Sequence, residues 1–306
     1  MTQTFDRFRY AAIVGLGLLT AGCDKAVVLN PKGPIADAER GLLFDAFAVM
    51  LVVIVPVIVM GFLFAWRYSA SRNARYEPKW DYSPKIDAVV WAIPALIVVA
   101  VAVLVWRSTH RLDPYRPLAS DVPPLDIEVV AQDWKWLFIY PKEGVASVNQ
   151  MAIPAGRPIS LRITSDTVMN SFYVPALAGQ IYAMAGMQTR LQLLADQPGK
   201  FVGRNTQYSG GGFSDQFFEV VATSPAEFDA WVAKARQAPA RLDPPTYAKL
   251  AEKSRLNPVT YYSAVEPRLF DTIIEKFAGP YGHGAHGAHG GHGSPGGQGT
   301  NPPARR

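Results

Sequence analysis

The side chains with the richest chemistry are scarce in this 306-residue chain, which contains one cysteine, Cys23, and five histidines. A single thiol excludes intramolecular disulfides, and it excludes Cys-rich zinc sites, iron–sulfur clusters and paired-cysteine copper centres built by this chain alone. Four histidines lie in a Gly-rich tail, at positions 283, 286, 289 and 292. This spacing suits flexible copper, nickel or zinc binding, although a solvated tail is the favoured interpretation.

Cys23 follows a sequence typical of export. Arg7 and Arg9 precede a short apolar run over 10–19, and small residues lead from there to the cysteine. These features are typical of a secretory signal peptide, and the run is too short to cross about 30 Å of hydrocarbon. The arrangement resembles a bacterial lipoprotein signal, which implies cleavage after residues 1–22, a lipid such as palmitate on Cys23, and retention at the inner membrane. A plain signal peptide or signal anchor with an incidental cysteine is the alternative.

Two segments without charged residues follow, at 46–66 and 88–106. Each has about the 20 residues that a spanning helix needs, and aromatic residues flank both, as they do at membrane interfaces. We therefore expect a transmembrane hairpin over 42–110, with helices at about 43–66 and 88–107. Two buried core helices of a soluble protein are the alternative.

The loop between the two segments predicts their orientation. It contains three acidic residues and five basic residues, Arg67, Arg72, Arg75, Lys79 and Lys85. Because basic loops favour the cytoplasmic side, the chain should cross a bacterial inner membrane twice and return outside. Everything after about residue 110 is then periplasmic.

The exported part begins with a β-rich domain, which we expect over 125–222. Short strands that alternate polar and apolar residues, or are rich in aromatic residues, are predicted at 126–130, 134–141, 158–164, 190–194 and 216–221. Several short strands between Gly- and Pro-rich turns favour a sandwich or barrel.

Helical spacing returns after the strands. Apolar residues three or four apart predict a helix around Phe228 to Ala235, and further helices are expected at 246–252 and 269–277. The predicted division of the chain is a signal peptide over 1–22, a mature N-terminal segment over 23–41, the hairpin, the β domain, a helical region over 223–278 and a disordered His/Gly-rich tail over 279–306.

Three local motifs connect this layout to a known family. They are Trp134-Lys135-Trp136 with Tyr140-Pro141, the segment 168–175 that contains Asn170-Ser171-Phe172, and the segment 181–187. Together with the lipoprotein-like start, the hairpin and the β domain, they resemble subunit II of haem–copper respiratory oxidases over about 10–277. The resemblance implies a membrane α plus all-β fold, in which a two-helix hairpin precedes a periplasmic cupredoxin-like sandwich with C-terminal helices.

The resemblance also draws attention to missing ligands. In the cytochrome c branch of this family, the sandwich binds two copper ions through two cysteines, two histidines, a methionine and a carbonyl oxygen. The corresponding loop here, 207–217, contains none of these side chains. The residues assigned to the degenerate copper-site region, with no metal expected, are Asn170 in place of the upstream histidine, Tyr208, Ser209, Gly212, Phe213 and Gln216.

These absences make the chain similar to the quinol branch of the family, and within it to the bo-type ubiquinol oxidases. That resemblance implies a subunit with a structural and assembly role, without a cofactor or catalytic residue of its own. The complex would oxidise ubiquinol, reduce oxygen to water and pump protons, with the haems and copper in subunit I. The expected partners are subunit I, smaller membrane subunits and lipid, and neither nucleic acid nor cytochrome c.

Two acidic residues near the membrane segments deserve separate interpretation. An acidic residue at the position of Asp87, usually Glu, lies in this family at the mouth of a proton-uptake pathway into subunit I. The resemblance implies that role here, whereas a favourable charge at a helix N-terminus is the structural explanation. For Asp45, at the end of the first segment, a solvated terminal charge is favoured over a functional intramembrane acid.

Two other functions are weighed against the leading one. Subunit II of a cytochrome c oxidase is disfavoured by the missing ligands. A free membrane-anchored lipoprotein, whose degenerate cupredoxin acts as a binding or scaffold module, is the alternative from another class. Trp134, Trp136 and Tyr140 belong to a segment that serves electron transfer in the copper branch; here we expect them to pack at the boundary between sandwich and membrane.

Overall fold

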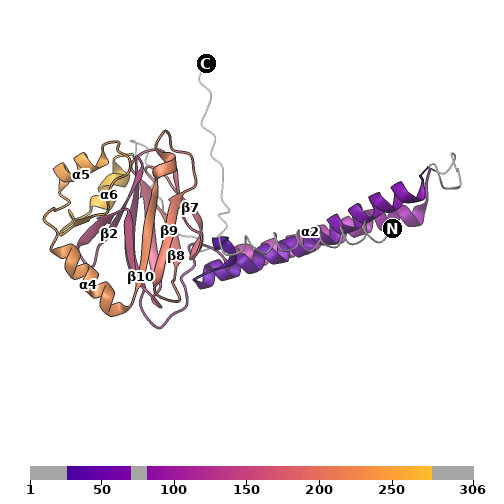
Figure 1. The fold of residues 1–306 in the computed structure, drawn as a ribbon, viewed down its shortest axis with the longest axis horizontal. Helices are drawn as coiled ribbons and strands as arrows, with labels where there is room; N and C mark the ends of the chain where they lie inside the picture. The colour runs from indigo at the N-terminus through magenta and orange to yellow at the C-terminus, as the bar shows by residue number, and fades with distance from the viewer. Residues whose placement is uncertain (1–25, 70–80, 278–306) are drawn as a thin grey trace, which may run out of the picture.

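The computed structural model describes residues 26–69 and 81–277, which form a long helix hairpin joined to a β-sandwich (Figure 1). The predicted signal peptide, Cys23 and the tail over 279–306 lie outside the described residues. So does most of the basic loop, including Arg72, Arg75 and Lys79.

The hairpin consists of α2 (Pro34–Arg67) and α3 (Pro84–Arg111), which follow a short 3₁₀ helix, η2 (Val27–Leu29). At 1.5 Å per residue, the helices are about 51 and 42 Å long, more than the roughly 30 Å of a bilayer core. Both are long and apolar enough to cross a membrane. Their apolar side chains are exposed, Phe62 to 75% and Trp91 to 73%, so the hairpin needs lipid or a partner protein around it.

Helix α2 begins earlier than the expected start at about 43, because its first turns dock on the sandwich instead of continuing the membrane span. The backbone N–H of Lys32 donates to the carbonyl oxygen of Ala176 over 2.7 Å. A side chain at Gly33 would overlap the carbonyl oxygen of Leu194, so only glycine allows this close approach. Ile35 then packs against the sandwich core.

The sandwich contains a six-stranded sheet and a five-stranded sheet. The first has the order β11–β3–β2–β1–β5–β8, with strands at Thr260–Tyr262, Val145–Val148, Lys135–Tyr140, Leu125–Gln132, Ile159–Ser165 and Thr189–Leu193. The second has the order β4–β10–β9–β6–β7, with strands at Gln150–Pro154, Phe217–Thr223, Gly199–Asn205, Asn170–Val174 and Ala178–Ala183. Neighbours are antiparallel except for the β1–β5 and β10–β4 pairs.

Aromatic rings from both sheets form the centre of the sandwich. Trp136 on β2 lies 5.5 Å from both Phe172 on β6 and Phe218 on β10, measured between ring centroids. Gly203 stands opposite Phe218 in the β9–β10 pair, where a Cβ would overlap that ring. Trp136 and Tyr140 are fully buried. The expectation that this segment packs at the membrane boundary is therefore wrong, because strand alternation turns these rings inward between the sheets.

Three helices follow the last long strand: α4 (Pro225–Arg236), α5 (Pro244–Ala251) and α6 (Leu269–Glu275). Helices α5 and α6 cover the outer face of the first sheet on the side away from the hairpin (Figure 1), whereas α4 packs against the main core beside β3, β4 and β10. Ser224 begins α4 with a capping box, in which its hydroxyl accepts from the Glu227 N–H and the Glu227 carboxylate accepts from the Ser224 N–H. The expected fold class, two apolar helices followed by a cupredoxin-like sandwich with C-terminal helices, is confirmed.

Candidate functional site

The residues assigned to the degenerate copper-site region come together only in part. Asn170 begins β6, and the other five lie in the loop between β9 and β10 that contains the 3₁₀ helix η3 (Phe213–Asp215). Asn170, Ser209 and Gln216 meet around Asn205, the last residue of β9. We call these four residues the polar pole of the sandwich.

The remaining predicted residues lie beside the polar pole without joining it. Tyr208 is 73% exposed, and its ring centroid lies 5.8 Å from that of Phe213. Gly212 has no side chain, and its backbone lies directly against the indole of Trp134. The prediction therefore named three members of the cluster and missed Asn205. No feature of the sequence singles out Asn205, since it becomes central only through the pairing of β6, β9 and β10.

Asn205 bridges the polar pole through its side-chain amide. Its Nδ2 donates to Asn170 Oδ1 over 2.7 Å, to Gln216 Oε1 over 2.9 Å and to Ser209 Oγ over 3.1 Å. Its Oδ1 accepts from the backbone N–H of Ser171 over 2.8 Å. Asn205 is only 4% exposed, so these contacts replace water for a buried amide.

The neighbours of Asn205 are satisfied as well. Asn170 Nδ2 donates to the Val168 carbonyl over 2.8 Å, and Ser209 Oγ donates to Gln216 Oε1 over 3.0 Å. Leaving a buried amide unpaired would cost about 1–3 kcal/mol. The four polar-pole side chains avoid this cost by pairing with each other and with the backbone. Their side-chain oxygen atoms are therefore already engaged as hydrogen-bond acceptors.

This donor set does not fit the copper centre of the cytochrome c branch. Thiolate and imidazole ligands bind copper, whereas the polar pole offers neutral amide and hydroxyl oxygens that already accept hydrogen bonds. Within residues 26–69 and 81–277, no three side chains of His, Cys, Asp or Glu lie close enough together to bind a metal ion.

Trp134 forms a lid over the loop at the polar pole. Its backbone φ is +66°, a left-handed conformation that is uncommon for a bulky residue, and its Nε1 donates to the Ser209 carbonyl over 3.2 Å. The indole lies so close to Gly212 that a Cβ there would overlap it. The guanidinium of Arg255 lies 5.1 Å from the Trp134 ring. The lid thus connects the strand hairpin, the glycine loop and the C-terminal region.

Lys135, next to the lid, is a buried lysine that ties the same regions together. It is 1% exposed, and its Nζ donates to the Glu252 carbonyl over 2.7 Å and to Ser254 Oγ over 2.6 Å. Burial lowers the pKa of Lys135, and the nearby carboxylates of Asp133 and Glu252 partly oppose that shift. Its contacts are those of a structural anchor, because both hydrogen-bond acceptors belong to the turn after α5.

Two family descriptions match this part of the chain. "Cytochrome C oxidase subunit II, periplasmic domain" matches residues 143–223, and "COX Aromatic Rich Motif" matches residues 236–281. The periplasmic domain of subunit II of cytochrome oxidase of Bradyrhizobium japonicum matches with a TM-score of 0.37 at 23% identity, covering 40% of this chain and 98% of that one.

Full-length relatives are closer. Cytochrome bo(3) ubiquinol oxidase subunit 2 of Pseudomonas putida is 50% identical over 263 residues, which cover 86% of this chain and 83% of that protein. Ubiquinol oxidase subunit 2 of Acetobacter aceti is 49% identical over 274 residues, covering 88% and 89%. The chain belongs to the ubiquinol oxidase subunit 2 family. The expected function, subunit 2 of a ubiquinol oxidase of the respiratory chain, is confirmed.

In this family member, Asp166 holds two of the C-terminal helices against the sandwich. Its side chain is 2% exposed and accepts from the Tyr247 hydroxyl of α5 over 2.7 Å and from Lys276 Nζ, just after α6, over 2.8 Å. Burial, with the Asp166 carboxylate as the second cause, raises the pKa of Tyr247 well above its usual value. Tyr247 therefore stays protonated and able to donate.

Arg162 forms a second connection between the sandwich and α6 of the subunit. Its guanidinium pairs with Glu128 over 2.8 Å and with Asp271 over 3.1 Å, and it lies 4.8 Å from the centroid of the Phe270 ring. Burial raises the pKa of Glu128, although the neighbouring Arg162 opposes the shift. The region matched by the aromatic-rich motif is thus fixed to β1 and β5 by charges as well as by apolar packing.

The hairpin places the two acidic residues of the membrane region far apart. Asp87 is exposed in the first turn of α3, at the end remote from the sandwich, about 36 Å along that helix from its other end. Asp45 on α2 lines a cavity beside α3 near the sandwich. The structure does not bring either acid near the polar pole.

Proposed function

We propose that this subunit contributes no redox centre to its ubiquinol oxidase and instead has a structural and assembly role. The observation that carries the proposal is the Asn205 bridge, in which neutral side chains occupy one another's hydrogen-bonding groups at the pole where the copper branch has its ligands. A chain without a copper relay fits an oxidase that takes electrons from a membrane-soluble quinol. Haems and copper then belong to subunit I.

The hairpin supplies the surface for assembly in this proposal. Its exposed apolar side chains fit the packing of subunit I and smaller membrane subunits on one side and lipid on the other. The sandwich, closed by α4, α5 and α6, covers the periplasmic face of the complex. A lipid on Cys23 would hold the mature N-terminus at the same inner membrane.

Purification of the complex through a tag on this chain tests the proposal. We expect co-purification with a haem-containing subunit, oxidation of ubiquinol by the preparation, and no absorption from a dinuclear copper centre. A dinuclear copper signal assigned to this chain would contradict the proposal. Recovery of the chain alone, without haem, would favour the free-lipoprotein function. The mass of the mature N-terminal peptide, compared with that from a Cys23→Ser variant, tests acylation.

We further propose that Asp87 lies at the entrance of the proton pathway into subunit I. The exposed carboxylate in the first turn of α3, at the cytoplasmic end of the proposed topology, supports this role. Asp87→Asn should reduce turnover by about tenfold, equivalent to ~1.4 kcal/mol on the limiting step, without loss of subunits. Asp81→Asn is the matched control, because it removes the same charge just before the helix. Unchanged turnover of the assembled Asp87→Asn enzyme would refute the role.

A further inference from the structure

Arginine side chains gather at the sandwich end of the hairpin, around a cavity of about 980 Å³. Arg107 and Arg111 come from the last turns of α3, and Arg116 comes from the linker that leads to β1. The charge-free segments of α2 and α3 end at this level, at residues 46 and 106. The cavity therefore lies where lipid headgroups meet the hydrocarbon.

These three arginines outnumber the acidic residues that line the same cavity. All three are exposed, and their guanidinium groups form no hydrogen bond or ion pair within the described part of the chain, although Asp45 lines the same cavity. The cavity thus holds three guanidinium groups against one carboxylate. Positive residues normally gather at the cytoplasmic ends of membrane helices, so an unpaired arginine cluster at the opposite end calls for a separate reason.

Apolar grooves adjoin this cavity, one at the same level of α3 and the other reaching three residues further, to Ile97. A groove of about 450 Å³ between α2 and α3 shares Val49, Leu104 and Ser108 with it. Another of about 600 Å³ along α3 shares Trp106 and His110 with it. Cationic groups at headgroup level, with apolar grooves beside them, match the two parts of a phospholipid molecule.

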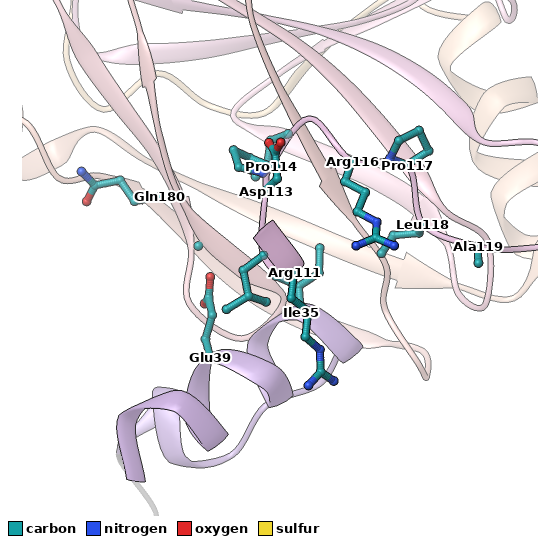
Figure 2. Close-up of a pocket in the computed structure, with 13 residues that line it drawn as sticks. Ile35, Glu39, Arg111, Asp113, Pro114, Arg116, Pro117, Leu118, Ala119 and Gln180 are labelled. Carbon is teal, nitrogen blue, oxygen red and sulfur yellow. The ribbon is translucent and has the colours of Figure 1, made fainter. Parts of the chain in front are cut away.

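A neighbouring cavity of about 320 Å³ is lined by both acidic and basic residues. Arg111 and Arg116 line both cavities. Figure 2 shows Glu39 on the side opposite these arginines, near β7, and the carboxylate of Asp113 also lines this cavity. Two arginines and two carboxylates line this smaller cavity, so the larger cavity, with three arginines and one carboxylate, is the one that suits a negatively charged group.

We infer that Arg107, Arg111 and Arg116 bind the phosphate of an anionic phospholipid in the outer leaflet, with its acyl chains in the two apolar grooves. The inference rests on the proposed membrane position of the hairpin. Arginine suits phosphate because its planar guanidinium donates two parallel hydrogen bonds. A lipid held here would fill the space between the hairpin and the linker that carries the sandwich.

Lipid binding to the purified oxidase complex tests this inference. The variants are Arg107→Gln, Arg111→Gln, Arg116→Gln and their combination. Arg241→Gln is the matched control, since this exposed arginine lies between α4 and α5, on the far side of the sandwich. After delipidation, native mass spectrometry would measure binding of phosphatidylglycerol, phosphatidylcholine and inorganic phosphate. We expect phosphatidylglycerol affinity to fall about fivefold for each arginine removed, and to be unchanged in the control.

Three outcomes would overturn the lipid site. One is retention of phosphatidylglycerol by the triple variant at the affinity of the unaltered complex. Another is equally tight binding of inorganic phosphate, which would indicate a free-anion site. The third is loss of a membrane subunit from the triple variant with lipid content unchanged, which would assign the arginines to a protein interface. Haem content and ubiquinol oxidation of the unaltered preparation separate this result from the proposed function: an active complex without lipid selectivity contradicts only the lipid site.

Discussion

The sandwich buries its apolar side chains within the chain, whereas the hairpin leaves its apolar side chains exposed. In the sandwich, the rings of Trp136, Phe172 and Phe218 are at most 2% exposed and pack against one another. In the hairpin, Trp91 and Phe62 are more than 70% exposed, although α2 and α3 lie along each other. The sandwich thus carries its own interior, whereas the hairpin depends on surroundings that the chain does not supply.

Their polar groups differ in the same way. The polar pole satisfies three buried side chains and the half-buried Ser209 within the chain, and α4 begins with a capping box. Neither α2 nor α3 has a side-chain cap; each begins with a proline that needs no backbone donor at that position. In a membrane helix, the continuous backbone ladder itself satisfies the polar groups. The sandwich is therefore stabilised by its own contacts and the hairpin by its solvent.

The largest expected effect comes from removing a ring at the centre of the sandwich. Trp136→Ala should lower the free energy of unfolding by about 3–5 kcal/mol, because it leaves a cavity between two closely packed sheets. Trp91→Ala, on an exposed position of α3, should leave the sandwich transition unchanged. Thermal unfolding of the full chain in detergent, followed by near-ultraviolet circular dichroism, measures both. Equal losses in the two variants would break the distinction between the regions.

A smaller effect is expected at the polar pole. Asn205→Ala should cost about 2–3 kcal/mol, since it leaves Asn170 Oδ1 without its donor and the Ser171 N–H without its acceptor. Ser209→Ala should cost only about 1 kcal/mol, because Gln216 Oε1 keeps its bond from Asn205. Denaturant unfolding of the full chain provides the measurement. A cost below about 0.5 kcal/mol for Asn205→Ala would show that water replaces the bridge easily.

The smallest effect concerns the pH dependence of the α4 cap. Hydrogen bonds from Ser224 lower the pKa of Glu227 below its ordinary value of 4.5. A lowered pKa in the folded state means that the carboxylate contributes stability above pH 4.5, and that this contribution is lost as pH falls through the lowered pKa. Amide exchange in the first turn of α4 should therefore rise on acidification relative to a Glu227→Gln variant. An identical profile in both proteins would exclude the carboxylate as the cause.

Some elements could be predicted from residue patterns alone. A strand with one polar face shows alternation, and a charge-free segment of sufficient length indicates a membrane helix. Strand β1 alternates buried and half-buried residues along its first four positions, and the two membrane segments are free of charge over about 20 residues. Strand β3 escaped prediction, because all four of its residues are buried and no alternation marks it. The start of α2 was missed for a related reason: its first turns belong to the sandwich contact and lie outside the apolar run.

The candidate site also contains features that the sequence predicts and features that depend on the fold. The absence of a cysteine, and of any histidine except His110, from the described part of the chain can be read directly from the sequence and decides which metal ligands are missing. Which side chains replace such ligands depends on strand pairing: Asn170 and Asn205 are 35 positions apart and meet because β6 pairs with β9. Trp134 becomes a lid through its left-handed backbone, which no periodicity reveals.

The sequence by itself determined the environment of each region, since composition alone decides whether a segment can be solvated by lipid or must form an interior. Only the tertiary structure decided the partners. Hydrogen bonds and ion pairs act over about 3 Å, so the Asn205 bridge and the connections through Asp166 and Arg162 exist only where the fold brings distant residues that close. The arginine cluster obeys the same rule, because α3 and the linker after it place Arg107, Arg111 and Arg116 around one cavity.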